Sequence, residues 1–326
     1  MDFYGTLGPS CLETEIIKKM FENGMTGMRL NLSHTGLKEA AGMIRIFRRG
    51  AEEACVSSPD LLIDMQGPEL RIGNLIKPLK LLGGEKIRLG RDIPVPESIF
   101  PLLEPGLKIQ LDDGKILLEV CDPAVDPVSC RILRGGKLEG KKSLSLIGKE
   151  NAGPSLTAQD RQNLKDAAEF GVTGIMQPFV RTREDLLEVR RVMEETGCGH
   201  LKLLAKIENA EGVESVTQFM DLADQIVIAR GDLGNSMPLW ELPGIQKSLS
   251  GICRRAGKPF MVVTQLLASM ESRPVPTRAE VSDIFNAVLD GAASLMVTGE
   301  TAVGSHPVEV IRYLVNTANE ATKYVI

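Results

Sequence analysis

The sequence has few of the residues on which several common enzyme classes depend. Among its 326 residues are only three histidines and six cysteines. The histidines show no spacing typical of a catalytic triad or a metal site, and no cysteines form a C-x-x-C pair or stand beside histidines at zinc-ligand spacing. We therefore expect neither serine nor cysteine hydrolase chemistry, no structural zinc, and reduced thiols as in a cytosolic protein.

The sequence also lacks an excess of positive charge and a long apolar segment. Lysine and arginine number 38 against 43 acidic residues, so the net charge is −5. A basic face for a nucleic-acid backbone is therefore not expected. No apolar run approaches the roughly 20 residues of a membrane span, and no basic-then-apolar leader opens the chain. We expect a soluble, cytoplasmic protein with neither nucleic acid nor membrane as a partner.

Short apolar runs alternate with amphipathic segments along most of the chain. With 43% hydrophobic residues, a chain of this length can bury a large core. About eight apolar runs and eight helices make the count of a (β/α)₈ TIM barrel, an α/β fold that we favour over an open doubly wound sheet. Helices are predicted over residues 12–23, 37–54, 158–170, 183–195, 212–220, 241–256, 278–290 and 307–323.

The helical period disappears over residues 69–153. Turn signals such as Asp113-Gly114 separate short alternating runs there. We therefore predict a barrel domain of residues 1–68 and 154–326 with a small all-β domain, residues 69–153, inserted after strand three. Insertions after a barrel strand lie on the catalytic face, so the insert is expected to act as a lid that excludes water. A decorative or oligomerisation module is the alternative.

Polar residues end or follow five of the predicted barrel strands. Barrel active sites are built from the carboxyl ends of strands, so these residues are expected to converge at one rim. Taken alone, Asn31 or Thr264 can equally be a helix N-cap. In the order of strands two, three, five, six and seven, the residues are Arg29 and Asn31, Asp64, Lys206 and Glu208, Asp232, and Thr264.

Lys206, Glu208 and Asp232 form the most informative group chemically. Mg²⁺ prefers a few carboxylate oxygens completed by substrate phosphate and water, which the two acidic residues supply. A lysine beside such an ion can stabilise charge on a transferring phosphoryl group or an enolate oxygen. A structural lysine–glutamate ion pair is the alternative.

One segment resembles a phosphate-binding P-loop but does not match its full pattern. Residues 135–142, GGKLEGKK, have the glycine and lysine spacing of a P-loop, but Lys142 stands where a serine or threonine belongs. The segment also lies in the predicted β insertion, without a strand-to-helix context. Any nucleotide is therefore expected to be held by other means.

The chain resembles the pyruvate kinase family over essentially its whole length. The motifs that carry this resemblance stand in family order and include GMRLNLSHTG at 27–36, DMQGPELR at 64–71, KIENAEGVE at 206–214, ARGDLG at 229–234 and TGETAVGSHPVE at 298–309. The resemblance implies transfer of a phosphoryl group from phosphoenolpyruvate to ADP, giving pyruvate and ATP. It also implies dependence on Mg²⁺ or Mn²⁺ and on K⁺.

The resemblance further implies a role for each residue that handles the phosphoryl group. Glu208 and Asp232 would hold the divalent metal ion. Lys206 and Arg29 would neutralise the phosphoryl group during transfer. The backbone amides of Gly231 and Asp232 would receive the carboxylate of the substrate.

Three more roles follow from the resemblance alone. Thr264 would lie near the carbon that is protonated after transfer. Asp113 is similar to the lid residue that closes over the site. The K⁺ site would consist of Asn31, Ser33, Asp64 and the backbone carbonyl of Met65.

Several positions depart from the family pattern. Pro178 stands where serine is usual, Asn235-Ser236 replaces a usual Val-Glu, and Ala268 replaces a glutamate. These changes leave the expected metal ligands and Lys206 in place, but those at Pro178 and Asn235-Ser236 adjoin the site. The chain also stops at Ile326 without the C-terminal regulatory domain of the family, so we expect no activation by sugar phosphates.

Two other functions stay open at this point. One is a metal-dependent enolate lyase or aldolase on a related barrel, and the other is a catalytically weak homologue that binds metabolites. The expected partners are phosphoenolpyruvate, pyruvate, ADP and ATP, and a homodimer through the barrel is also considered.

Overall fold

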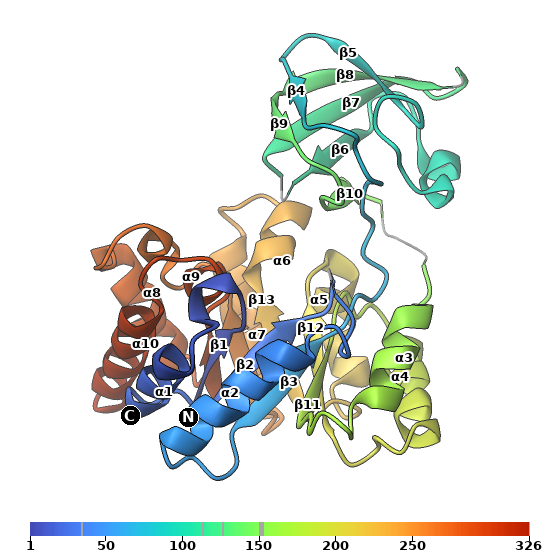
Figure 1. Cartoon of the computed structure of the whole chain (residues 1–326). Helices are drawn as coiled ribbons and strands as arrows, with labels where there is room; N and C mark the ends of the chain where they lie inside the picture. Colours follow the sequence, from blue (N-terminus) through green and yellow to red (C-terminus); the bar gives the residue numbers. More distant parts are fainter. Residues whose placement is uncertain (34, 113, 126, 150–152, 326) are drawn as a thin grey trace. The chain divides into compact units, whose positions relative to one another are not determined.

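The computed structural model describes residues 1–33, 35–112, 114–125, 127–149 and 153–325. Contacts divide the chain into two compact units (Figure 1). Met1–Gly67 and Pro154–Ile326 make the first unit, and Pro68–Gly153 make the second. Each unit buries a hydrophobic cluster of its own.

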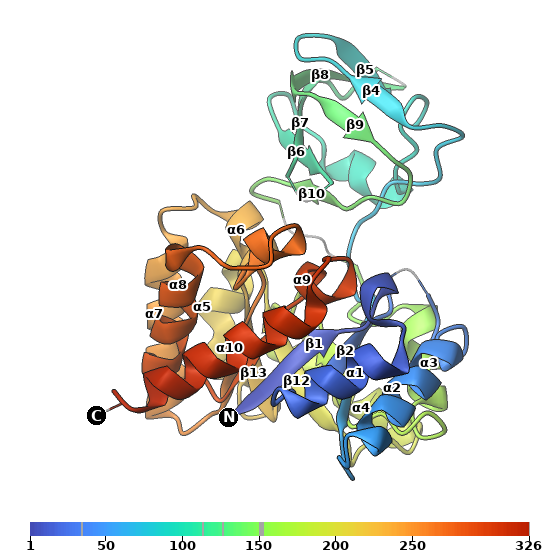
Figure 2. The same cartoon turned by 60° about the vertical axis from the view of Figure 1, so that its left-hand side comes forward.

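The first unit is a closed barrel of eight parallel strands surrounded by helices, which confirms the predicted fold class (Figures 1 and 2). Around the barrel the strands follow the order β1-β15-β14-β13-β12-β11-β3-β2. Their bounds are β1 Asp2–Thr6, β2 Gly27–Asn31, β3 Asp60–Asp64, β11 Gly174–Gln177, β12 Lys202–Ile207, β13 Gln225–Ala229, β14 Phe260–Val263 and β15 Ser294–Met296.

The barrel strands are almost continuously apolar because both of their faces are covered. A parallel strand with helices outside and side chains inside has no face left for water. All four residues of β14, FMVV, are buried accordingly. The inner cluster shows that the barrel centre is a packed core, and it consists of Tyr4, Leu62, Met176, Leu204, Val227, Ala229, Met261, Val263 and Met296.

Eight predicted helices surround the strands, several of them shorter than expected. Three begin at a reciprocal capping box, in which a threonine and an acidic residue three positions later accept each other's amides, at Thr157, Thr182 and Thr277. The helices are α1 Thr14–Glu22, α2 Ala41–Glu53, α3 Ala158–Asp166, α4 Arg183–Glu195, α5 Ala210–Phe219, α7 Leu242–Arg255, α8 Arg278–Leu289 and α10 Pro307–Thr322. No helix in the described parts of the chain combines the length and apolar composition needed to cross a membrane.

In the described part of the first unit, four shorter helical segments were not predicted. They are α6 Arg230–Ser236, α9 Gly299–Ala302 and the 3-10 helices η1 Pro9–Cys11 and η3 Ala268–Glu271. Each is too short to show a helical period in sequence. Two of them nevertheless matter for the site, because α6 and η3 follow barrel strands β13 and β14.

The second unit is all-β, as expected for the insertion. Its larger sheet is antiparallel in the order β10-β6-β7-β8-β5, and β4 pairs with β9. The strands are β4 Leu79–Leu81, β5 Lys86–Leu89, β6 Lys108–Leu111, β7 Ile116–Asp122, β8 Val128–Arg134, β9 Gly136–Leu138 and β10 Leu144–Leu146, with a 3-10 helix, η2, at Glu97–Leu102. Asp113, between β6 and β7, lies outside the described residues.

Candidate active site

The strand register places the predicted site residues at one rim of the barrel. Asn31 and Asp64 are the last residues of β2 and β3 and are paired across these strands. Lys206 is the penultimate residue of β12, and Glu208 follows the strand directly. Asp232 lies in the first turn of α6, which begins where β13 ends. Because parallel strands end at the same edge, these residues share the carboxyl rim.

Four side chains at this rim form a buried ionic cluster. Arg29 approaches Oδ2 of Asp64 with Nη2 at 2.6 Å and Nε at 2.8 Å. Lys206 Nζ lies 3.1 and 3.2 Å from the two carboxylate oxygens of Asp64 and 3.0 Å from Oε1 of Glu208. The ion pair of Lys206 and Glu208 that sequence left as a structural alternative is therefore present, but it belongs to a larger cluster. Lys206 bridges two buried carboxylates.

Burial and charge act against each other in this cluster. Burial alone would lower the pKa of Lys206, but attraction by Asp64 and Glu208 outweighs it and raises that pKa. Burial alone would raise the pKa of Asp64, but the charges of Lys206 and Arg29 lower it. Burial raises the pKa of Glu208 to about 7, and repulsion from Asp232 and Asp64 adds to the rise while Lys206 opposes it. Lys206 is thus held charged beside an ionised Asp64.

A backbone amide that was not predicted also holds Glu208. Phe179 N donates to Oε2 of Glu208 at 2.9 Å, so Lys206 and Phe179 fix one carboxylate oxygen each. Phe179 has a φ of 50°, a left-handed conformation that is uncommon for an aromatic residue. The preceding residue is Pro178, one of the departures from the family pattern. The packing is tight here, because a Cβ on Gly67 would lie 2.5 Å from the Pro178 ring.

Thr264 lies directly after β14 and beside Gly231, which belongs to the first turn of α6. A Cβ placed on Gly231 would lie 3.5 Å from Cγ2 of Thr264, which is ordinary contact distance. Thr264 has a φ of 71° and Gln265 a φ of 56°. Arg230 Nη2 donates to the Thr264 carbonyl at 2.7 Å. The structure therefore brings Thr264 beside Gly231, as a shared substrate site requires.

The residues proposed for a monovalent cation lie next to one another. Asn31 Oδ1 accepts the Ser33 amide at 3.1 Å, and Asp64 is the strand partner of Asn31. Helix α2 begins only at Ala41, so Asn31 does not cap it. With the carbonyl of Met65, the donors are all oxygens, which suits a hard cation. Within the described residues no group of three or more His, Cys, Asp or Glu side chains gathers as a metal site.

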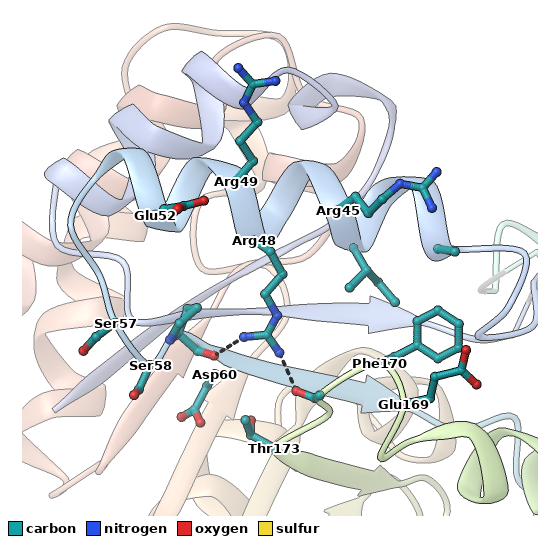
Figure 3. A pocket seen from close by; sticks show the side chains of 14 residues that line it. Arg45, Arg48, Arg49, Glu52, Ser57, Ser58, Asp60, Glu169, Phe170 and Thr173 are labelled. Atoms are coloured by element: carbon teal, nitrogen blue, oxygen red, sulfur yellow. Dashed lines mark hydrogen bonds between the residues drawn. The ribbon is translucent and has the colours of Figure 1, made fainter.

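A cavity elsewhere on the barrel contains none of the predicted site residues. It measures about 910 Å³ and lies between α2 and the segments that precede β3 and β11 (Figure 3). Arg48 reaches across it to donate to the backbone carbonyls of Pro59 and Gly171. Asp60 and Thr173, which also line it, mark the amino-terminal ends of strands. The cavity therefore lies at the amino-terminal ends of the strands, whereas the ionic cluster lies at the carboxyl rim.

Comparison with known proteins gives one consistent result. A family model described as the barrel domain of pyruvate kinase matches residues 2–311. The pyruvate kinase of Aeropyrum pernix is 38% identical over 322 residues, covering 98% of this chain and 70% of the relative. The enzyme of Chlamydia pneumoniae is 36% identical over 328 residues, covering 98% and 68%.

A third relative shows how much shorter this chain is. The pyruvate kinase of Geobacillus stearothermophilus is 37% identical over 319 residues, covering 94% of this chain but 54% of the relative. The chain thus spans between 54% and 70% of the length of these three proteins. The match to the barrel family is nevertheless almost complete. This chain belongs to the pyruvate kinase family.

Proposed function

We propose that this chain transfers the phosphoryl group of phosphoenolpyruvate to ADP, giving pyruvate and ATP. The observation that carries the proposal is the buried bridge of Lys206 between Asp64 and Glu208, with Arg29 also paired with Asp64. It lies at the barrel rim where active sites are built, in a chain of the pyruvate kinase family.

The reaction calls for the cations that this rim supplies. Phosphoenolpyruvate, ADP and one proton give pyruvate and ATP. The bond between phosphorus and the enol oxygen breaks, and a bond to a terminal oxygen of ADP forms. The electron pair left behind restores the carbonyl, and the methylene carbon takes up the proton. Since such transfers depend on positioning and charge neutralisation, Lys206 and Arg29 are the residues that would stabilise the moving phosphoryl group.

The carboxylates around Lys206 prepare it for this role. Hydrogen bonds to Asp64 and Glu208 fix the ammonium group before any substrate binds, so little reorganisation is needed during transfer. The amides of Gly231 and Asp232, in the first turn of α6, would receive the substrate carboxylate. Thr264, which packs against Gly231, would then lie near the carbon that is protonated.

Glu208 and Asp232 fit a divalent cation, Mg²⁺ or Mn²⁺. Their mutual repulsion contributes to the raised pKa of Glu208, and a cation between acidic groups relieves such repulsion. One or two carboxylates are enough for Mg²⁺ when phosphate and water complete its coordination. When bound, the ion supplies positive charge to the phosphoryl and enol oxygens. Asn31, Ser33, Asp64 and the Met65 carbonyl would hold K⁺.

The two other candidate functions make different predictions. A lyase or aldolase would release pyruvate without ADP, and a weak homologue would bind phosphoenolpyruvate with negligible turnover. Membership of the pyruvate kinase family favours the kinase over both. If turnover is impaired, as in a weak homologue, the cause would lie at Pro178. This residue directly precedes Phe179, whose amide holds Glu208.

A pyruvate-release assay tests the proposal. It is run with phosphoenolpyruvate, with and without ADP, Mg²⁺ and K⁺, on wild type, Lys206→Met and Lys202→Met. Lys202 is a matched control, because it lies on the same strand and forms a more exposed ion pair with Asp60. We expect ADP-dependent turnover that falls on the order of 10²-fold or more in Lys206→Met and stays near wild type in Lys202→Met. Release without ADP, or an unaffected Lys206→Met, would contradict the proposal.

A further inference from the structure

We propose that Arg230 is a positioning residue that holds Thr264 in the conformation needed for proton transfer to the enol carbon. The inference rests on the proposed function and deepens it. Arg230 itself is not placed at the reacting atoms. It acts through the backbone of Thr264, which lies against Gly231 in the first turn of α6.

The guanidinium of Arg230 ties together three parts of the barrel. Nη2 donates to the Thr264 carbonyl after β14 at 2.7 Å. Nη1 lies 2.8 and 2.7 Å from the two carboxylate oxygens of Asp283 on α8, and 3.4 Å from Oε1 of Gln246 on α7. The Arg230 side chain is only 10% exposed. Because the guanidinium group is planar and rigid, binding of Nη1 by the Asp283 carboxylate fixes the direction in which Nη2 donates.

The residue that receives this donor has an unfavourable backbone conformation. The φ of 71° at Thr264 is a genuine outlier for a β-branched side chain, and Gln265 follows with a φ of 56°. Such conformations persist only where the surrounding structure over-determines them, and they gather at functional sites. Without the Arg230 hydrogen bond, the peptide between residues 264 and 265 is free to leave the left-handed region. The Thr264 side chain would then move away from Gly231.

The side-chain contacts of Arg230 do not include the ionic cluster that is proposed to neutralise the phosphoryl group, although Asp232 lies two residues further along α6. Within the described chain, the side-chain hydrogen bonds of Arg230 run to Thr264, Gln246 and Asp283. The cluster of Arg29, Asp64, Lys206 and Glu208 comes from β2, β3 and β12 instead. Loss of Arg230 should therefore impair protonation of the enol carbon more than phosphoryl transfer. A residue with a merely structural role would impair both steps equally.

Two rates separate these steps. In D₂O with Mg²⁺, K⁺ and ATP, exchange of the pyruvate methyl hydrogens breaks one C–H bond to form the enolate and then forms one C–D bond. Proton NMR follows this exchange. Quenched single turnovers with phosphoenolpyruvate and ADP follow ATP formation. We expect Arg230→Met to slow exchange by about 10²-fold, the loss typical of a misplaced group, and to slow ATP formation much less.

A backbone rescue tests the mechanism directly. Gln265 is exposed, so its side chain can be removed without disturbing the core. Glycine adopts positive φ at little cost, whereas alanine does not. In the Arg230→Met background, Gln265→Gly should therefore recover part of the exchange rate, and Gln265→Ala should not. An electrostatic role of Arg230 would predict no difference between the two.

Arg190 supplies the matched control. Its guanidinium also links a backbone carbonyl, that of Leu222 at 2.9 Å, to a carboxylate, that of Asp224 at 2.8 Å. These contacts lie before β13, away from the carboxyl rim. Arg190→Met should leave the ratio of exchange to ATP formation unchanged. If Arg230→Met does not fold, Asp283→Asn is the second variant. It keeps the guanidinium group of Arg230 but weakens the ion pair that holds it, so a smaller fall in the ratio of exchange to ATP formation is expected.

The outcomes are distinguishable. A lower ratio in Arg230→Met or Asp283→Asn, with rescue by glycine only, supports the positioning role. An unchanged ratio in both variants overturns it, whether the two rates fall together or stay at the wild-type level. Wild-type protein without exchange or ATP formation would overturn the proposed function itself, and this inference with it.

Discussion

The same two strands carry the same pair of residues at both ends of the barrel. Asp60 and Lys202 begin β3 and β12, and four residues later Asp64 and Lys206 lie at the other end. At the amino end the ammonium and carboxylate are 3.4 Å apart, with the side chains 56% and 22% exposed. At the carboxyl end they are 3.1 Å apart and only 11% and 3% exposed. Position in the barrel, not residue type, distinguishes the two pairs.

The neighbours of each pair explain the difference. At the amino end Asp60 also accepts a hydrogen bond from the Tyr4 hydroxyl at 2.8 Å, and an exposed ion pair of this kind contributes little to stability. At the carboxyl end Lys206 faces two carboxylates with little water to screen them. Buried charges of this kind depend on every partner. The comparison shows that the carboxyl rim, unlike the amino end, concentrates buried charge, which the proposed reaction would use.

The largest expected effect comes from removing Lys206, and the matched removal of Lys202 should have a small one. Lys206→Met leaves the buried carboxylates of Asp64 and Glu208 without their shared cation, so the free energy of unfolding should fall by about 3–5 kcal/mol. Lys202→Met should lower it by less than about 1 kcal/mol. Urea denaturation of the two variants and wild type, at one pH and salt concentration, measures both values. Equal losses would show that the two ends of the barrel are energetically alike.

A smaller effect is expected from divalent metal. Mg²⁺ that binds only the folded protein stabilises it by about 2.7 kcal/mol at a concentration 100 times its Kd. Thermal unfolding should therefore shift upward with added Mg²⁺ in wild type and in Asp60→Asn, but not in Glu208→Gln. A Mg²⁺ shift that survives Glu208→Gln would place the metal elsewhere.

A third effect is the pH dependence of stability. The pKa of Glu208 rises from its ordinary value of 4.5 to about 7 on folding, so the folded state binds more protons within this window. Stability should therefore fall as the pH rises from about 4.5 to 7. Asp64 acts in the opposite sense, because its lowered pKa makes stability fall as the pH drops below its ordinary value of 3.8.

Glu208→Gln provides the control for this profile. Denaturation at a series of pH values without metal should show a flatter profile between pH 4.5 and 7 in the variant than in wild type. An unchanged slope would mean that Glu208 does not titrate in this window. Asp60→Asn, at the other barrel end, should leave the slope intact.

Sequence predicts the barrel well because its signals are periodic or positional. Alternating apolar runs and amphipathic segments predict the strands and helices, and polar strand ends predict that Asp64, Lys206 and Glu208 converge at one rim, where Lys206 is found to bridge the two carboxylates. Short elements escape this reasoning. Helix α6 carries both Arg230 and Asp232, yet its seven residues are too few to show a period.

The missed parts of the site depend on backbone conformation and on distant contacts. The amide of Phe179 reaches Glu208, and the carbonyl of Thr264 reaches Arg230, because non-glycine residues adopt positive φ there. No residue pattern signals such conformations. Asp160 is a related case. The sequence predicts its capping box with Thr157, but it does not predict that Asp160 also accepts the Gln66 and Gly67 amides, 94 and 93 residues away.

The most direct test of the central claim compares the initial rates of ADP-dependent pyruvate formation in Lys206→Met and Lys202→Met. The claim is that the buried lysine between two carboxylates, rather than its counterpart four residues earlier, neutralises the phosphoryl group. We expect the Lys202→Met rate to exceed the Lys206→Met rate on the order of 10²-fold or more. Similar rates in the two variants would contradict the account.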